Sequence, residues 1–460
     1  MSLNRDVFRK YDVRGVSEID FSGDFPFLLG KAFGSYIIGE GGNKIAVSGD
    51  VRLSTARLKK GFINGLIDTG INVVDIGILP TPVNYFSNYH LDIDGSVQIT
   101  GSHNPSEYNG FKFTFNKKSF FGDDIQKLYD IIIDSEYKSG KGSYSEINII
   151  TPYIDTIVSK FNFKRNIRVI MDCGNAAGCI VAPEIFKKLG INLEELYCDI
   201  DGTFPNHHPD PTVDSNLEMI VQKIKQGSFD LGIAYDGDAD RVICIDSKGN
   251  IIRSDILMCF FIQDVLRKSS VKKIIYDVKC SSAVKDIINK FGGEPIEWKT
   301  GHSLIKNKMH TEKAPFGGEM SGHIFFADRY YGYDDALYAA VRLLGILAKS
   351  CTSLFNLCET LPKTISTPEI RFPCDDSEKF RLVNKVRKSA YAIPGADINE
   401  LDGVRVTTTD GWWLLRASNT QPVLVVRFES WSDDGMMRLK DTLGKLLAET
   451  GIDYSMVESS

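Results

Sequence analysis

The chain has 460 residues, a formal net charge of -6 at pH 7 and a sequence pI of about 5.8, so it lacks the basic charge typical of nucleic-acid-binding proteins. Its length predicts about three or four domains, and no apolar run reaches the ~18 residues that a membrane span needs. The first residues lack the apolar segment of a signal peptide, and the nine cysteines form no Cys-x-x-Cys pair. We therefore expect a cytoplasmic protein with reduced thiols and with neither a nucleic-acid nor a membrane partner.

Strand-like runs alternate with amphipathic, helix-like runs through roughly the first 360 residues, which predicts α/β domains with mixed or parallel sheets. In the first of these regions we expect three strands, at 45–48, 72–76 and 96–100. Two helices are expected in the same region, over about 55–70 and 82–90. The polar stretch 134–146 is too hydrophilic for a core, and we place the first domain boundary there.

The same alternation restarts twice, which predicts two further α/β domains of related architecture. The expected elements are strands at 169–172, 231–235 and 273–276 and helices over about 179–189 and 255–267. Beyond Pro362 the pattern changes to that of a smaller α+β domain, with helices over about 376–387 and 435–449 and strands at 404–408, 412–415 and 423–428. We therefore expect four domains, over residues 1–148, 149–250, 251–363 and 364–460.

The segment from Ile99 to Lys112 places a serine between turn residues directly after an apolar strand-like run. Gly101 and the Asn104-Pro105 pair disfavour a regular helix or strand, so Ser102 should lie in a loop held by the elements on either side. We interpret Ser102 as the carrier of a phosphoryl group. Taken alone, the motif fits an ordinary polar turn equally well.

Three aspartates at alternate positions follow a second strand, at Asp236, Asp238 and Asp240. In an extended or turning segment this spacing points the carboxylates to one side, where they repel one another unless a cation binds between them. An EF-hand is excluded because its sixth position would be Arg241 and its twelfth Ser247. The pattern therefore favours a Mg²⁺ site with room for a phosphate oxygen, and a solvated acidic turn is the alternative.

The segment 318–323 brings a carboxylate, a hydroxyl and an imidazole between glycines, through Glu319, Ser321 and His323. A carboxylate that accepts hydrogen bonds from vicinal hydroxyls is a common way to bind a sugar, so this segment is a candidate hexose-binding loop. The alternative is a glycine-rich turn in which His323 only packs. No segment matches a phosphate-binding P-loop or a dinucleotide fingerprint, so nucleotide chemistry is not expected.

A fourth polar loop, residues 416–422, lies between two expected strands of the last domain. It combines a guanidinium, two hydroxyls, an amide and backbone N–H groups, which together suit a phosphate dianion, through Arg416, Ser418, Asn419 and Thr420. A polar hairpin turn is the alternative. Arg14, Lys279 and His302 lie next to glycines or at strand ends, where each alone would more often be a surface residue.

The four loops, in this order along the chain, resemble the phosphohexomutase superfamily, most closely its bacterial phosphomannomutase/phosphoglucomutase members. The matching segments are 100–105, 236–241, 318–323 and 416–422, and the resemblance covers essentially the whole chain. It implies a monomer with three related α/β domains and a smaller C-terminal domain around a central cleft. It also implies an isomerase that interconverts hexose 1-phosphate and hexose 6-phosphate, of mannose or glucose, through phosphorylated Ser102. The intermediate would be a hexose 1,6-bisphosphate that reorients in the cleft.

The resemblance assigns roles to individual residues. Phosphorylated Ser102 and the three aspartates would hold Mg²⁺, Glu319 and Ser321 would bind the sugar 3- and 4-hydroxyls, and the loop at Arg416 would bind the phosphate that does not react. Lys112 becomes a candidate proton acceptor and His103 a supporting group. The remaining residues that it places in the cleft are Tyr11, Arg14, Arg241, Lys279, His302 and His323. One departure is Gln421, where the family often has Thr.

Two other functions are compatible with the same motifs. A phosphatase that forms an aspartyl phosphate could use Asp236 as its nucleophile, because an aspartate pair after a strand also suits that chemistry. A phosphosugar-binding regulator could keep the pocket without turnover. The serine and all three aspartates are present, which favours an enzyme.

Overall fold

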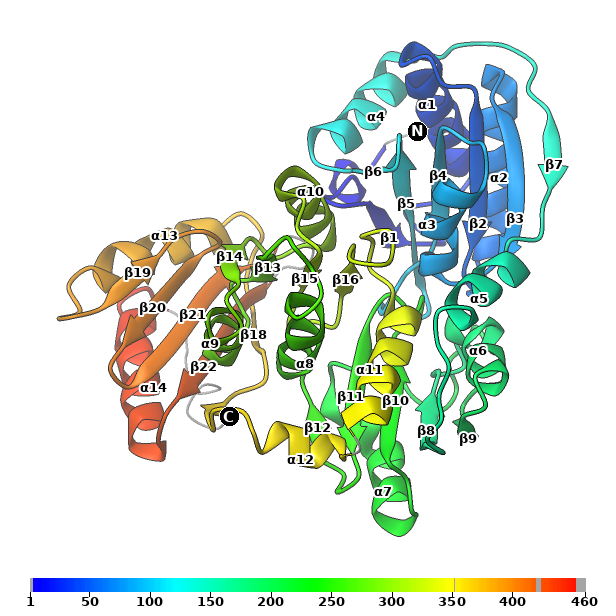
Figure 1. The fold of residues 1–460 in the computed structure, drawn as a ribbon. Coiled ribbons are helices and arrows are strands. Elements are labelled where there is room, and N and C mark those ends of the chain that lie inside the picture. Colours follow the sequence, from blue (N-terminus) through cyan, green and yellow to red (C-terminus); the bar gives the residue numbers. More distant parts are fainter. Residues whose placement is uncertain (1–2, 351, 419–422, 452–460) are drawn as a thin grey trace.

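The computed structural model describes residues 3–350, 352–418 and 423–451, which form four β-sheets with helices packed against them. Figure 1 shows the N-terminal sheet at the upper right, the second sheet at the lower right, the third near the centre and the C-terminal sheet at the left. The predicted fold class, three related α/β domains followed by a smaller α+β domain, is confirmed. No helix in the described part of the chain combines the length and the apolar character needed to cross a membrane.

The first sheet has seven strands, in the order β1-β5-β4-β2-β3-β7, with β6 paired to β5. Its strands are β1 (Val13–Val16), β2 (Lys44–Gly49), β3 (Asn72–Ile78), β4 (Gly95–Ile99), β5 (Tyr108–Phe115), β6 (Lys118–Phe120) and β7 (Tyr144–Glu146). Its helices are the 3-10 turn η1 (Arg5–Val7), α1 (Phe25–Gly39), α2 (Thr55–Thr69), α3 (Thr81–His90) and α4 (Asp123–Asp134). The polar stretch after α4 therefore returns to this sheet, because β7 pairs in parallel with β3.

The second sheet has the order β12-β11-β10-β8-β9 and the third has the order β14-β13-β15-β16. The second comprises β8 (Arg168–Asp172), β9 (Asn192–Leu196), β10 (Leu231–Tyr235), β11 (Val242–Asp246) and β12 (Ile251–Ile252), with α5 (Ile150–Val158), η2 (Ala177–Ile180), α6 (Ala182–Lys188), η3 (Asp214–Leu217) and α7 (Glu218–Gln226). The third comprises β13 (Lys273–Asp277), β14 (Glu294–Trp298), β15 (Phe316–Gly318) and β16 (Ile324–Phe326), with α8 (Ser254–Leu266), α9 (Ser282–Lys290), α10 (His302–Glu312), α11 (Ala336–Ser350) and α12 (Leu354–Cys358).

The first three sheets share one four-stranded core, which explains their related architecture. The order is β5-β4-β2-β3 in the first, β11-β10-β8-β9 in the second and β16-β15-β13-β14 in the third. In each core the first strand named is antiparallel to its neighbour and the other three are parallel. The loop that leads into the antiparallel strand is therefore in the same place in all three domains. It is the β4–β5 loop in the first, the β10–β11 loop in the second and the β15–β16 loop in the third.

The fourth sheet is antiparallel throughout, in the order β17-β22-β21-β20-β19, with β18 paired to β22. Its strands are β17 (Ile365–Ser366), β18 (Ile370–Pro373), β19 (Asp397–Asn399), β20 (Val404–Thr408), β21 (Gly411–Ala417) and β22 (Val423–Ser430). Two helices, α13 (Lys379–Ala390) and α14 (Asp433–Ala448), pack against it.

One hydrophobic cluster continues across the first three domains, from Ala46 and Val74 through Met171 to Ile274 and Phe326. The close packing of such a core leaves little freedom for the domains to move independently. The C-terminal sheet has a separate core around Trp413.

Two helices begin later than the sequence pattern predicts, for local reasons. The helix expected over 179–189 is divided into η2 and α6, which starts with Pro183 in its first turn, where the missing N–H is tolerated. The helix expected from residue 376 begins at Lys379, because the Asp375 carboxylate accepts hydrogen bonds from the backbone and hydroxyl of Ser377 and holds that segment as a turn.

Candidate active site

The three equivalent hairpins carry three of the four loops singled out from the sequence. The β4–β5 loop carries Ser102, the β10–β11 loop carries the aspartates, and the β15–β16 loop carries Glu319 and His323. They meet at a cleft whose cavity has a volume of about 140 Å³. All four sheets contribute to its lining, because Arg416, Ser418 and Val425 come from the last domain.

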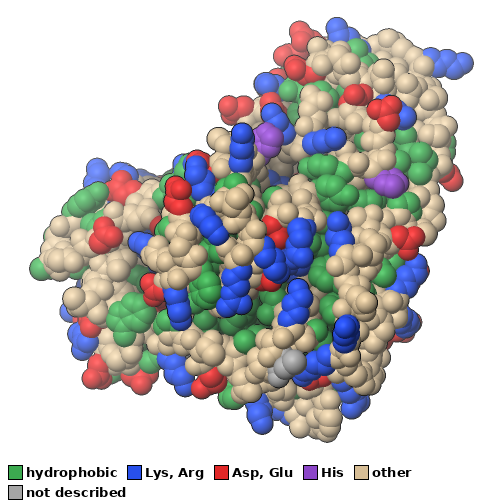
Figure 2. Space-filling view, in the orientation of Figure 1, with side chains coloured by type: hydrophobic (Ala, Val, Ile, Leu, Met, Phe, Trp, Pro, Cys, Tyr) green, Lys and Arg blue, Asp and Glu red, His purple; other side chains and the backbone are tan. Residues whose placement is uncertain are grey.

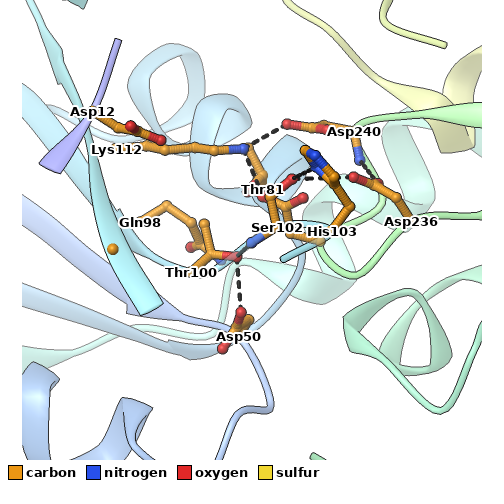
Figure 3. A network of polar contacts seen from close by, with 12 residues as sticks. Asp12, Asp50, Thr81, Gln98, Thr100, Ser102, His103, Lys112, Asp236 and Asp240 are labelled. Carbon is orange, nitrogen blue, oxygen red and sulfur yellow. Dashed lines mark hydrogen bonds and ion pairs between the residues drawn. The ribbon is translucent and has the colours of Figure 1, made fainter. Parts of the chain in front are cut away.

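Ser102 is held in a strained turn, with a φ of 50°, and is only 2% exposed. Its backbone N–H donates to Thr100 Oγ1 at 2.8 Å. Its Oγ lies 3.2 Å from Asp236 Oδ2 and 3.1 Å from His103 Nδ1. Figure 3 shows Ser102 pointing toward the aspartate loop, so the structure brings these two loops together as the sequence interpretation requires.

The Ser102 loop is held in place by Arg52, whose side chain is completely buried. Its nitrogens donate to the carbonyl oxygens of Ser102 and Asn104 at 2.6 Å and of Pro105 at 2.5 Å. Asp50 pairs with Arg52 at 3.2 Å and accepts the Thr100 hydroxyl at 2.8 Å. The loop lacks regular secondary structure, and this arginine replaces the hydrogen bonds that a helix or sheet would supply.

The three aspartates are fully buried, and their carboxylate oxygens lie within 4.8 Å of one another. Lys112, on β5, reaches into this group, with its Nζ 2.7 Å from Asp238 Oδ2 and 2.6 Å from Asp240 Oδ2. The Thr81 hydroxyl at the start of α3 donates to Asp238 at 2.5 Å. Figure 3 shows Lys112 extending from the first domain to the second.

This donor set fits a hard divalent cation. Asp238 Oδ1 and Asp240 Oδ1 are buried and have no hydrogen-bond partner among the described residues. Burial, followed by the charges of Asp240 and Asp238, raises the pKa of Asp236 well above its usual value. Burial alone would also raise the pKa of Asp240, but the charges of Lys112 and His323 lower it overall. A divalent cation would relieve the repulsion from Asp240 and Asp238 that helps to raise the pKa of Asp236, which favours a metal ion at this position.

His103 and Arg14 both lie beside the serine loop. Burial, then the charges of Arg241 and Arg14, lowers the pKa of His103 well below its usual value, so the imidazole is neutral at pH 7. Arg14 pairs with Asp12 at 2.5 Å and lies 3.4 Å from the Gly101 carbonyl. Its position next to the serine loop agrees with the cleft-lining place expected for it.

The β15–β16 loop adds a carboxylate and an imidazole. Glu319 accepts the backbone N–H of Gly301, and the Ser321 hydroxyl donates to its other oxygen at 3.3 Å. Burial raises the pKa of Glu319 above its usual value. The His323 ring stacks on His302, with centroids 5.3 Å apart.

The two ring nitrogens of His323 face different neighbours. Arg241 Nε donates to His323 Nε2 at 3.0 Å, so Nε2 carries the lone pair. Nδ1 lies 3.0 Å from Asp334 Oδ2 and 3.5 Å from Asp240 Oδ1. A ring with a proton on Nδ1 and a lone pair on Nε2 therefore matches both neighbours.

On the far side of the cleft, cations from the third and fourth domains face carboxylates. Lys279 Nζ lies 2.6 Å from Glu369, and Arg416 lies 3.2 Å from Asp402. Although burial raises the pKa of Glu369, the charges of Lys279 and Arg371 lower it well below its usual value. This side of the cleft holds a concentrated set of cations that a phosphate group can use.

Comparisons with known proteins identify the family. Four domain families match in succession, each described as phosphoglucomutase/phosphomannomutase: alpha/beta/alpha domains I, II and III at residues 5–138, 151–249 and 253–365, and the C-terminal domain at 369–445. The chain belongs to the phosphoglucomutase/phosphomannomutase family. The resemblance inferred from the four loops is thereby confirmed.

Individual members of the family are similar over nearly the whole length. A phosphomannomutase/phosphoglucomutase from Pseudomonas putida is 41% identical over 96% of this chain and 95% of its own. A phosphoglucomutase from Neisseria gonorrhoeae is 39% identical over 96% of both chains. The crystal structure of a phosphoglucomutase/phosphomannomutase family protein from Burkholderia thailandensis has a TM-score of 0.92 and 40% identity, covering 98% of each chain.

In this family member, most of the residues singled out from the sequence line the cleft. They are Tyr11, Arg14, Ser102, His103, Lys112, Arg241, Lys279, His302, Glu319, Ser321, His323, Arg416 and Ser418, with the three aspartates directly behind them. Asn419 and Thr420 lie outside the described residues. Sequence reasoning missed the cleft-lining residues Asp12, Asn104, Thr300, Gly301, Glu369, Arg371 and Val425. Of these, Asp12 and Asn104 could have been suggested by their places in the Arg14 and Ser102 motifs.

Proposed function

We propose that the chain interconverts hexose 1-phosphate and hexose 6-phosphate through a phosphoserine at Ser102, with a hexose 1,6-bisphosphate as intermediate. The observation that carries this proposal is the position of the Ser102 hydroxyl, 3.2 Å from a buried aspartate in a cleft made by all four sheets. In the first half-reaction the P–O bond to Ser102 breaks and a bond to the free sugar hydroxyl forms. In the second, the other phosphoryl group returns to Ser102.

We propose that Asp236, Asp238 and Asp240 hold Mg²⁺ together with the phosphoserine. When bound, the ion neutralises charge that develops on the transferring phosphoryl group. The unpartnered oxygens of Asp238 and Asp240 support this assignment. Lys112 remains next to the same carboxylates, where its ammonium group adds positive charge beside the reacting phosphate.

The substrate hydroxyl must release a proton, and the surroundings of Lys112 and His323 bear on which group can accept it. Burial lowers the pKa of Lys112, but Asp238 and Asp240 raise it more. In His323, Nε2 accepts a hydrogen bond from Arg241 Nε and Nδ1 faces Asp334, so neither ring nitrogen offers a free lone pair to a substrate hydroxyl. We therefore keep Lys112 as the candidate proton acceptor, because a divalent cation bound to the same carboxylates would lower its pKa.

Substrate must bind in two opposite orientations, because either end of the bisphosphate has to face Ser102. Glu319 and Ser321 suit the sugar 3- and 4-hydroxyls, which occupy nearly equivalent places after the reorientation. The phosphate remote from Ser102 would then bind Lys279, Arg416 and Ser418, with Asn419 and Thr420 of the same loop. The lysine and the arginine already lie in the cleft wall opposite the serine.

We also propose that the four domains extend over residues 1–148, 149–250, 251–363 and 364–460, since each range contains one of the four sheets apart from the two-residue strand β12 of the second sheet, which lies just beyond residue 250. We propose that the protein is a monomer, as the resemblance to its family implies. A cytoplasmic location agrees with the free thiols of the described cysteines, because reducing compartments keep cysteines unpaired.

The direct test is conversion of glucose 1-phosphate by the purified protein with Mg²⁺ and a trace of glucose 1,6-bisphosphate. We expect glucose 6-phosphate to form, and parallel assays with mannose 1-phosphate and glucosamine 1-phosphate rank the sugars. Failure of phosphorylated protein to turn over any of the three sugars would favour a phosphosugar-binding regulator. Mass mapping of the phosphopeptide should place the label on Ser102. A label on Asp236 in a fully active Ser102→Ala protein would instead establish an aspartyl-phosphate phosphatase.

A further inference from the structure

A second and larger cavity lies between the first and third domains, away from the catalytic cleft. Its volume is about 550 Å³, which is within the range of small-molecule binding sites. One wall comes from α3 and the β5–β6 hairpin, and the other from α10 and the segment 327–333. Among the described residues, none lines both this cavity and the catalytic cleft.

Aromatic rings from both domains form part of the wall. Tyr85 and Tyr89 come from α3, and Tyr331 and Tyr333 come from the facing segment. Tyr89 stacks on Tyr331, with ring centroids 4.7 Å apart and planes inclined by 30°. Tyr89 is 37% exposed, so part of its ring surface is not covered by Tyr331. Stacked tyrosines at a cavity wall suit a flat ring.

Cations lie beside these rings. Lys117 occupies the two-residue turn Asn116-Lys117, where both residues have positive φ, as a type I′ hairpin requires, and its Nζ lies 5.4 Å from the Tyr89 ring centroid. Lys118, His310 and Lys313 also line the cavity. On the face drawn in Figure 2, Lys and Arg side chains border hydrophobic ones where the first domain meets the region of α10.

The lining contains little negative charge to neutralise these lysines. Its one described acidic residue, Asp328, is already paired with the buried Arg342 at 2.9 Å. In the described part of the chain, no carboxylate forms an ion pair with Lys117, Lys118 or Lys313. The cavity therefore combines an aromatic wall with uncompensated positive charge.

We propose that this cavity binds a nucleoside diphosphate, with its base stacked on the tyrosines and its phosphates bound by the lysines of the rim. A hexose phosphate has no flat ring to stack, so the tyrosine wall favours the nucleotide over the substrates of the catalytic cleft. Binding of this kind depends on stacking and on exposed lysines, and it requires none of the glycine-rich phosphate motifs that the sequence lacks.

The cavity is connected to the catalytic cleft through one lysine. Lys306 lies in the cavity wall, with its Nζ 4.0 Å from the Tyr85 ring centroid and 2.9 Å from Asp334 Oδ1. The other oxygen of Asp334 is 3.0 Å from His323 Nδ1. A diphosphate that draws Lys306 away from Asp334 changes the charge next to His323, so occupancy of the cavity is expected to alter turnover.

The test is calorimetric titration of the full-length protein with ADP, adenosine and ribose 5-phosphate, with and without saturating glucose 1,6-bisphosphate. We expect ADP to bind in both conditions, and each fragment to bind at least about tenfold more weakly. Absence of ADP binding, or its loss when glucose 1,6-bisphosphate is present, would overturn the proposal. Ribose 5-phosphate that binds as tightly as ADP would equally overturn it, because stacking would then contribute nothing.

Substitutions of exposed residues test where the ligand binds, and we expect them to leave the fold unchanged. Lys117→Glu should weaken ADP binding at least about tenfold, whereas the same charge change at Lys60→Glu, on α2 outside the cavity, should change it less than about twofold. Tyr89→Leu should weaken ADP but not inorganic phosphate. Equal ADP binding by Lys117→Glu and Lys60→Glu would place the ligand elsewhere. For the connection to His323, ADP should change kcat or KM of the wild type and not of Lys117→Glu, and unchanged wild-type kinetics would disprove that connection.

Discussion

The two sides of the catalytic cleft are built differently. On the side of the first and second domains, the reacting groups are joined to each other: Ser102 lies 3.2 Å from Asp236, and Lys112 lies 2.7 Å from Asp238. These side chains are almost completely buried, and the loop of Ser102 is held from behind by Arg52. This side is organised before substrate arrives.

On the side of the third and fourth domains, the cationic side chains are paired with carboxylates. A substrate phosphate would have to compete with these carboxylates for the cations. Lys279 pairs with Glu369, and Arg416 pairs with Asp402. From this difference we expect that the first side affects the rate of chemistry and the second affects the affinity for substrate. Substitutions on the first side should therefore lower kcat, and those on the second should change KM.

Ser102→Ala should have the largest effect. The variant lacks the oxygen that we propose carries the phosphoryl group, while its loop keeps the hydrogen bonds from Arg52 to the backbone. We expect kcat to fall by at least about 10³-fold with little change in thermal stability. A coupled assay for hexose 6-phosphate and intact-mass measurement of phosphorylation test this together. A phosphorylated, active variant would show that another residue carries the group.

Asp238→Asn should come next. The amide keeps the size of the side chain, but Lys112 then faces one carboxylate fewer and a metal loses a charged ligand. We expect activity to fall by at least about 10–100-fold and the Mg²⁺ concentration for half-maximal rate to rise. EDTA should abolish wild-type activity, and Mg²⁺ should restore it. Glu195→Gln, the same charge change on the surface of the second domain, is the control and should leave both quantities unaltered.

Arg52→Met tests how much the Ser102 loop depends on structural support from Arg52, because this residue is not one of the proposed reacting groups. It leaves the Asp50 carboxylate without its buried partner and removes the donors to the carbonyl oxygens of the Ser102 loop. We expect the free energy of unfolding to fall by about 3–5 kcal/mol, together with a loss of activity. Arg381→Met, at an exposed ion pair with Glu378, should cost only about 0–1 kcal/mol. Similar denaturation midpoints for the two variants would contradict a supporting role for Arg52.

Glu369→Gln should have the smallest effect. It should change KM and the pH dependence of thermal stability. Removing a carboxylate from the phosphate side should lower KM for hexose phosphate by about two- to fivefold, with kcat nearly unchanged. Because Lys279 and Arg371 lower the pKa of Glu369 in the folded protein, its stabilising contribution is present above the usual value of 4.5 and is lost as the pH falls below it.

Melting temperatures at pH 7 and at pH 4 check the sign of this contribution. The difference between wild type and Glu369→Gln should be larger at pH 7. A larger difference at pH 4 would mean that the carboxylate is not stabilised by the two cations.

Most strands and helices were predictable because each depends on residues close in sequence. Two helix starts were misplaced, because Pro183 and the turn at Asp375 act locally in ways that hydrophobic periodicity does not report. The four loops were also predictable, since each combines its reactive groups with turn residues within about seven positions. Arg52, Glu369 and Asp334 were not, because their partners lie far away along the chain and no local motif marks them.

The sequence by itself determined which chemical groups share a loop, and the order of those loops was enough to indicate a phosphohexomutase. Only the tertiary structure decided which loops face each other and what charge each group carries there. The resemblance makes Lys112 a candidate proton acceptor, and in the structure two buried carboxylates raise its pKa, whereas burial lowers the pKa of His103. The physical reason is that desolvation and charge–charge interactions depend on distance and burial in space, which spacing along the chain does not specify.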